Sequence, residues 1–231
     1  MCTCTGPARG ARTASAGDPT ARSRIVLAVS AQHDTPMSPG LPAVFLDRDD
    51  TLIACRAVAP DGDLGDPGLV ELLPGVRGAC LSLRRAGFTL VVVSNQGGVA
   101  RGRFGVDAVH AVNERLNELL GGLVEAFRFC PFHPRGVAPG FDVEHFWRKP
   151  RPGMILDAAE VLGLDLSRSW MVGDAVRDCQ AGRAAGCRTI LIGDEWPAES
   201  DGGDAVDALA PDLRSAAEAI IAMAREEEGV A

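Results

Sequence analysis

Two aspartates stand one residue apart, directly behind a short apolar run. The run is Ala43 to Leu46, and Asp47 and Asp49 follow it within Asp-Arg-Asp-Asp-Thr. Because alternate side chains of a strand share a face, both carboxylates would lie on one side. Paired carboxylates resist desolvation unless a cation lies between them, and Mg²⁺ takes carboxylate oxygens together with substrate phosphate. A polar turn or a helix N-cap is the alternative, since Asp is common at both.

Three later segments carry further polar side chains. Ser94-Asn95-Gln96-Gly97-Gly98 follows a valine run, and its hydroxyl and backbone N–H groups could cradle an oxyanion, although Asn and Gly also form ordinary turns. Arg148 to Gly153 places three cations in four positions, as a phosphate site or a solvated loop would. Asp174 and Asp178 lie four residues apart at a predicted helix start, where they could bind an ion or cap the helix.

Strand and helix patterns alternate from Leu41 onward, which predicts a mainly parallel sheet with helices on both faces. The expected class is therefore α/β, a three-layer α/β/α doubly wound sheet. Its polar clusters follow strands, where such sheets bind ligands. The apolar spacing predicts strands at 43–47, 88–93, 124–129, 170–173, 188–192 and 205–209, and helices at 75–86, 106–120, 153–162, 175–185 and 213–226.

Composition excludes several classes of function. The chain of 231 residues has a net charge of −8, which argues against nucleic acid or an anionic membrane as the main partner. Seven cysteines at irregular spacing indicate reduced thiols, and no apolar run is long enough to span a bilayer, so we expect a cytoplasmic protein. With 46% hydrophobic but only 5% aromatic residues, the core must be mainly aliphatic.

Residues 1–40 are rich in small residues and Pro and show no periodicity, so we expect a disordered tail before a single domain at 41–231. An organelle transit peptide is a weaker alternative. A start of translation at Met37 is a third.

The order of the four segments resembles the haloacid dehalogenase (HAD) superfamily of phosphohydrolases, subclass III. The similarity extends from about residue 41 to about 225 and is strongest to the heptose 1,7-bisphosphate phosphatase and histidinol-phosphatase subfamily. The segments that carry it are Phe45-Leu46-Asp47-Arg48-Asp49, Ser94 to Gly102, Cys130-Pro131 and Arg148 to Met154.

The residues and the resemblance imply the same chemistry. Asp47 would attack phosphorus and form an aspartyl-phosphate, and Asp49 would protonate the leaving oxygen and then activate water. Mg²⁺ would be held by Asp47, by Asp49 through its backbone carbonyl, and by Asp174.

Other residues would bind and orient the phosphate. Ser94 and Lys149 would hold phosphoryl oxygens, and Asp178 would orient this group from behind. The resemblance places three further residues on the substrate side, namely Asn95, Arg101 and Arg148.

No room remains for a separate cap domain between the motifs, so the site should be open and its loops should select the substrate. A sugar phosphate is the expected partner, and the resemblance favours a monomer. Histidinol phosphate, a phosphorylated nucleic-acid end, phosphotransfer and a non-catalytic protein of this fold remain alternatives.

The chain departs from the subfamily at four places. One is Ser94, where the family often has Thr, but Ser keeps the hydroxyl donor. Asp50 stands where relatives usually have Gly, and Ala175 where they often have Lys. Relatives often carry a zinc loop of Cys and His, of which only Cys130 remains, because the matching positions read Phe132, His145 and Trp147. Zinc is therefore not expected, although Cys130, His133 and His145 could form an unusual site. We expect this loop to pack through its aromatic residues, Phe132, Phe141, Phe146 and Trp147.

Overall fold

The computed structural model describes residues 40–230 of the chain, with side chains to residue 227. The expectations of a disordered tail, a transit peptide and a start at Met37 concern residues outside this range, and they stay predictions.

Six parallel strands form one sheet in the order β3-β2-β1-β4-β5-β6, so the predicted doubly wound α/β class is confirmed. The central strand β1 pairs with β2 on one side and β4 on the other, which places Val44 beside both Leu90 and Trp170. The strands are β1 Ala43–Leu46, β2 Thr89–Asn95, β3 Ala126–Cys130, β4 Trp170–Gly173, β5 Arg188–Ile192 and β6 Ala208–Ala210.

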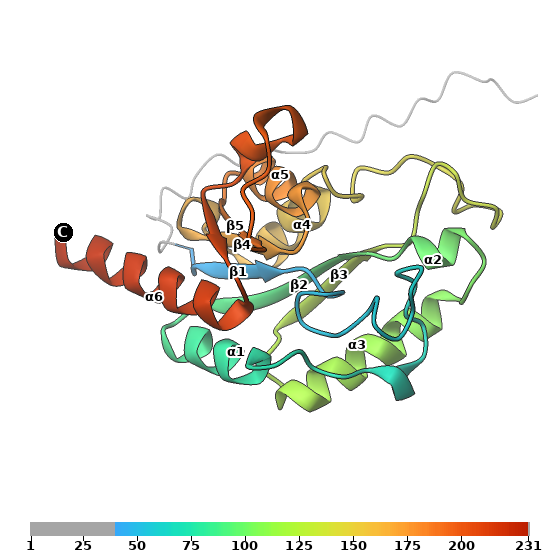
Figure 1. The fold of residues 1–231 in the computed structure, drawn as a ribbon, viewed down its shortest axis with the longest axis horizontal. Helices are drawn as coiled ribbons and strands as arrows, with labels where there is room; N and C mark the ends of the chain where they lie inside the picture. The colour runs from blue at the N-terminus through green and yellow to red at the C-terminus, as the bar shows by residue number, and fades with distance from the viewer. Residues whose placement is uncertain (1–39, 231) are drawn as a thin grey trace, which may run out of the picture. The chain divides into compact units, whose positions relative to one another are not determined.

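Helices cover both faces of the sheet (Figure 1). The α-helices are α1 Val76–Arg85, α2 Gly97–Ala100, α3 Val106–Leu120, α4 Gly153–Leu162, α5 Val176–Ala185 and α6 Leu213–Val230. Short 3-10 helices are η1 Pro67–Leu69, η2 Leu166–Arg168, η3 Glu199–Asp201 and η4 Gly203–Ala205. None of the described helices combines the length and apolarity needed to cross a membrane.

The two core layers follow from the alternation of side chains along the strands. Val44 and Leu46 of β1 pack with α1, α3 and α6, whereas Ala43 and Phe45 pack with α4 and α5 on the opposite face. Because β1 is covered on both sides, all four of its residues are buried. The strand is thus a rigid base for the polar residues that follow it.

Several predicted boundaries were wrong, among them that of β3, which was predicted at 124–129 and spans Ala126–Cys130. Strand β2 continues through Ser94 and Asn95, because these polar residues still pair with β3. Gly97 and Gly98, for which no helix was predicted, begin helix α2. The last strand begins at Ala208, because 203–205 form η4. Only η1 and α1 separate β1 from β2, and only α2 and α3 separate β2 from β3, so no cap domain interrupts these two connections.

Candidate active site

The fold gathers acidic side chains at the carboxyl edge of the sheet. Asp47 follows β1 and its N–H donates to Val172 of β4 at 2.9 Å, while Asp174 follows β4 directly. One carboxylate oxygen from each of Asp47, Asp174 and Asp178 lies within 4.8 Å of the others. Three carboxylates at this separation repel each other unless cations neutralise them.

Lys149 supplies one such cation. Its side chain is 1% exposed, and Nζ lies 2.6 Å from Asp47 Oδ1 and 2.8 Å from Asp178 Oδ1. Nζ also donates to the Val93 carbonyl at 2.8 Å. Burial alone would lower the pKa of Lys149, but the charges of Asp178 and Asp47 raise it, so the amine is protonated.

The cluster has capacity for a further cation. Oδ1 of Asp174 is buried without a hydrogen-bond partner, and burial, followed by the charge of Asp47, raises the pKa of this carboxyl. Burial likewise raises the pKa of Asp178 to about 6, against the opposing charge of Lys149. Unpartnered oxygen donors in an acidic cluster fit a hard divalent ion such as Mg²⁺.

Asp178 also organises the start of α5. Its Oδ2 accepts the N–H of Ala175 at 3.1 Å, and the side chain is fully buried. The backbone of Gly173 leaves room for it, because a Cβ at that position would lie 2.4 Å from Asp178 Oδ2. This carboxylate therefore fixes both Lys149 and the first turn of the helix, in line with an orienting role.

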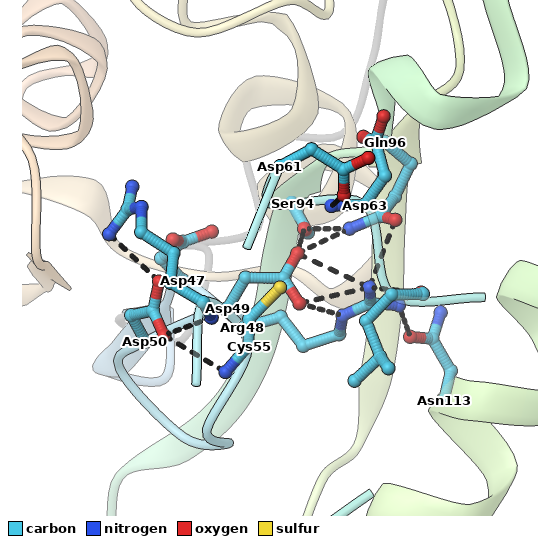
Figure 2. Close-up of polar contacts among 12 residues, drawn as sticks. Asp47, Arg48, Asp49, Asp50, Cys55, Asp61, Asp63, Ser94, Gln96 and Asn113 are labelled. Carbon is cyan, nitrogen blue, oxygen red and sulfur yellow. Dashed lines mark hydrogen bonds and ion pairs between the residues drawn. The ribbon is translucent and has the colours of Figure 1, made fainter. Parts of the chain in front are cut away.

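The Asp49 carboxylate is turned away from this cluster toward a set of buried donors (Figure 2). Oδ2 accepts from Gln96 Nε2 at 2.7 Å, and Arg48 donates to both oxygens. The Ser94 hydroxyl lies 3.5 Å from Oδ2 and accepts from Gln96 at 2.7 Å. Burial raises the pKa of Asp49, Arg48 lowers it and Asp47 raises it further. A raised pKa suits a carboxyl that donates a proton.

The predicted substrate-side residues have different surroundings. The Asn95 amide holds the backbone of Lys149, since it accepts from Lys149 N and donates to Lys149 O, both at 3.0 Å. Arg101 forms a two-point ion pair with Asp63. Arg148 donates to a loop carbonyl, that of Phe132, at 3.2 Å.

Asp50 adopts a positive φ of 57°, in the left-handed region that favours Gly. Its Oδ1 accepts the N–H groups of Cys55 and Arg56 at 2.9 and 3.0 Å. Oδ2 pairs with the Arg56 guanidinium at 2.8 Å, and the same nitrogen lies 3.0 Å from Asp174 Oδ2. Asp50 thereby shapes the loop that brings Arg56 to the acidic cluster.

A small cavity of about 60 Å³ lies over these residues. Its charged lining residues are Asp47, Asp49, Asp50, Arg56, Lys149 and Arg177. Mixed charges in so small a volume suit a phosphoryl group with a cation, and any larger part of a ligand would lie outside, against the loops.

Aromatic rings pack against one another in part of the loop between β3 and α4. The rings of Phe132 and His145 stack with centroids 4.3 Å apart, and Phe132 meets Phe141 at 5.6 Å. The expectation for Phe146 was wrong, because this side chain is 55% exposed. Within residues 40–227, the structure does not bring Cys130, His133 and His145 together as a metal-binding group.

Reasoning from sequence assigned no role to Arg48, Gln96, Asn113 or Arg56, all of which contact the site. Asn113 offered a signal, because it is a polar residue on the otherwise apolar stripe of α3. Arg48 and Gln96 lie inside motifs that the resemblance identified, but their contacts depend on how β1, β2 and α3 pack. Arg56 lies in a loop without periodicity.

A doubly wound parallel sheet with an aspartate cluster and a buried lysine at its carboxyl edge defines a metal-assisted phosphoryl-transfer enzyme. Comparisons with known proteins agree. The profile of the HAD-hydrolase-like family matches residues 146–216. Curated relatives include a D-glycero-beta-D-manno-heptose-1,7-bisphosphate 7-phosphatase of Mesorhizobium japonicum, 45% identical over 64% of this chain and 67% of the relative.

A phosphatase of the same description from Yersinia pestis is 36% identical over 74% of this chain and 90% of its own length. Among solved structures, the D,D-heptose 1,7-bisphosphate phosphatase of B. bronchiseptica, complexed with magnesium and phosphate, has a TM-score of 0.65 at 28% identity and covers 79% of this chain and 99% of its own. The chain belongs to this family of HAD phosphatases.

Proposed function

We propose that the protein is a Mg²⁺-dependent phosphomonoesterase that removes one phosphate from a small sugar phosphate, with heptose 1,7-bisphosphate as the first candidate. The observation that carries the proposal is the convergence of the carboxylates of Asp47, Asp174 and Asp178, two of which, Asp47 and Asp178, pair with the buried amine of Lys149. The substrate named for the relatives supports the choice of sugar. We expect a monomer in the cytoplasm that has no nucleic-acid partner.

Asp47, Asp174 and the backbone carbonyl of Asp49 would hold the ion. When bound, Mg²⁺ would neutralise charge on the phosphoryl oxygens as a Lewis acid. The unpartnered Oδ1 of Asp174 supports this assignment. We expect no requirement for zinc, because the loop after Cys130 has lost the usual ligands.

Asp47 would attack phosphorus through a carboxylate oxygen, while the bond from phosphorus to the leaving oxygen breaks. Asp49 would give its proton to that oxygen, so the alcohol leaves neutral. Asp49 would then take a proton from water, whose oxygen attacks phosphorus and releases phosphate and free Asp47. Lys149 and Ser94 would hold the non-bridging oxygens, and Asp178 would keep Lys149 in place.

The sugar would lie outside the small cavity, where loops replace a cap. Asn95 lines the cavity itself. Arg101 and Arg148 would act toward the rest of the substrate. Burial lowers the pKa of Arg148, the neighbouring Cys130 raises it, and the charges of Arg101 and Arg177 lower it. Clustered guanidiniums of this kind favour an anionic ligand.

The proposal is tested by phosphate release from heptose 1,7-bisphosphate, histidinol phosphate and a 3′-phosphorylated oligonucleotide. Chelator-treated protein should regain activity with Mg²⁺ alone and prefer the heptose. Asp47→Asn should lower kcat at least about 10³-fold, because it removes the nucleophile. Asp107→Asn, an exposed aspartate on α3, is the matched control. Equal rates for Asp47→Asn and the unmodified protein would refute the mechanism, and a preference for the oligonucleotide would refute the substrate class.

A further inference from the structure

Arg48 is a fully buried cation at 0% exposure, between the two aspartates proposed for catalysis. Removing a guanidinium from water is unfavourable unless nearly every N–H finds an acceptor. The hydrogen-bond acceptors of the Arg48 guanidinium come from four separate parts of the chain (Figure 2).

The first acceptor is the neighbouring carboxylate of Asp49. Arg48 Nε donates to Oδ1 at 3.0 Å and Nη2 to Oδ2 at 3.2 Å, so the planar guanidinium meets both oxygens. Such a two-point contact fixes the plane of a carboxylate and not only its distance.

Other contacts fix Arg48 in turn. Its Nη1 donates to Asn113 Oδ1 of α3 at 3.2 Å, and Nη2 to Gln96 Oε1 at 2.9 Å. Nη2 also approaches the Leu64 carbonyl of the loop before η1, at 3.3 Å. Gln96 closes a ring, because its Nε2 donates to Asp49 Oδ2 at 2.7 Å.

A purely structural role would not need this charge. Buried ion pairs add little net stability compared with apolar residues of similar size. The network reaches the site cavity through Asp49, which lines it and whose side chain is 17% exposed. Asn113, in contrast, is not among the lining residues.

We propose that Arg48, held by Asn113 and Gln96, is a positioning residue that fixes the plane of the Asp49 carboxylate at the lining of the site cavity. The proposal rests on the proposed function, in which Asp49 is the acid and base. Without Arg48, the carboxyl would rotate, and proton transfer to a poor leaving group would slow while attack by Asp47 would not.

The test compares kcat/KM for an alkyl sugar phosphate with kcat/KM for p-nitrophenyl phosphate. Both values report formation of the aspartyl-phosphate, but the nitrophenolate leaves without a proton. Arg48→Met should lower the alkyl value about 10- to 100-fold and the aryl value less than about threefold. Asn113→Ala should act in the same direction by about three- to tenfold, which provides a second variant should Arg48→Met fail to fold.

Asn117→Ala is the matched control on the same helix, because the Asn117 amide binds only the backbone of Val124. This variant should leave the ratio of the two kcat/KM values, alkyl to aryl, unchanged even where it lowers the melting temperature. In an Asp49→Asn background, Asn113→Ala should add no further loss, since it would act through Asp49.

Equal losses on both substrates, or additive losses with Asp49→Asn, would overturn the positioning role while leaving the phosphatase assignment intact. Failure of the proposed function has a different signature, in which Asp47→Asn retains the activity of the unmodified protein.

Discussion

Asp50 combines a left-handed backbone with a side chain that serves three partners. The φ of 57° favours Gly over residues with a Cβ, at about 1–2 kcal/mol for an ordinary side chain. Asp is among the residues that tolerate this region, because its side chain can bond locally. Here its carboxylate accepts two backbone N–H groups and pairs with Arg56. These contacts of the Asp50 carboxylate therefore offset the cost of a Cβ at positive φ.

Two substitutions at this position separate backbone strain from the lost contacts. Asp50→Ala and Asp50→Gly both remove the carboxylate, but only Ala keeps a Cβ at positive φ. We expect Asp50→Ala to lower the free energy of unfolding by about 1 kcal/mol more than Asp50→Gly, as measured by urea denaturation. Equal stability of the two variants would show that the left-handed backbone imposes no constraint there.

At the residue scale, the sequence predicted that Asp47 and Asp174 approach each other. The expectation that the Asp47 and Asp49 carboxylates share one side was wrong, because Arg48 and Gln96 hold that of Asp49 away from the cluster. Asp47 and Asp174 do meet, as the motif order implied. The position of Asp49 in the buried network could not be predicted, because Asn113 reaches Arg48 only after α3 packs on the sheet. Hydrogen bonds between distant segments leave no periodic signal in a sequence.

At the scale of elements, α5 lies close enough to β4 to require glycine at one contact. A Cβ on Gly182 would lie 2.4 Å from the Cβ of Met171, whereas Gly78 of α1 has no atom within 4 Å of such a position. The two helices have 10 residues each, and Gly182 lies in the second half of α5 whereas Gly78 lies in the first turn of α1. The two glycines form a pair for testing how closely α5 must approach the sheet.

We expect Gly182→Ala to lower the free energy of unfolding by about 1–3 kcal/mol, because the methyl group overpacks the contact with Met171. Gly78→Ala should raise it by up to about 0.5–1 kcal/mol, because Ala restricts the unfolded chain more than Gly does and its methyl group meets open space. Urea denaturation measures both. Stabilisation by Gly182→Ala would contradict the close approach of α5 to β4.

The ends of helices were predictable where a glycine caps the helix. Helices α3 and α4 lie at the predicted residues and end at Gly121 and Gly163 in the left-handed conformation. Helix α2 was missed, because Gly97-Gly98 is also typical of a turn. There a Cβ on Gly98 would lie 2.4 Å from the Phe104 ring, so the glycine serves a tertiary contact that local patterns do not reveal.

For the whole molecule, the alternation of strands and helices predicted the layers and the edge that carries the site. Parallel strands must place their carboxyl ends together, so motifs far apart in sequence were expected to meet. The contacts of the site loops were not predictable in this way, for example those of Arg56 and Arg101. Their pairing with Asp174 and Asp63 arises only in the folded chain.

If Asp47 takes the phosphoryl group at the edge of the sheet, an aspartyl-phosphate forms at this residue and can be trapped. Protein quenched during turnover with Mg²⁺ would be reduced with borohydride, which converts an aspartyl-phosphate to homoserine, and its peptides weighed by mass spectrometry. We predict homoserine at position 47 in this sample and none in a sample without substrate. Conversion at a different aspartate, with residue 47 unchanged while phosphate is released, would contradict the account.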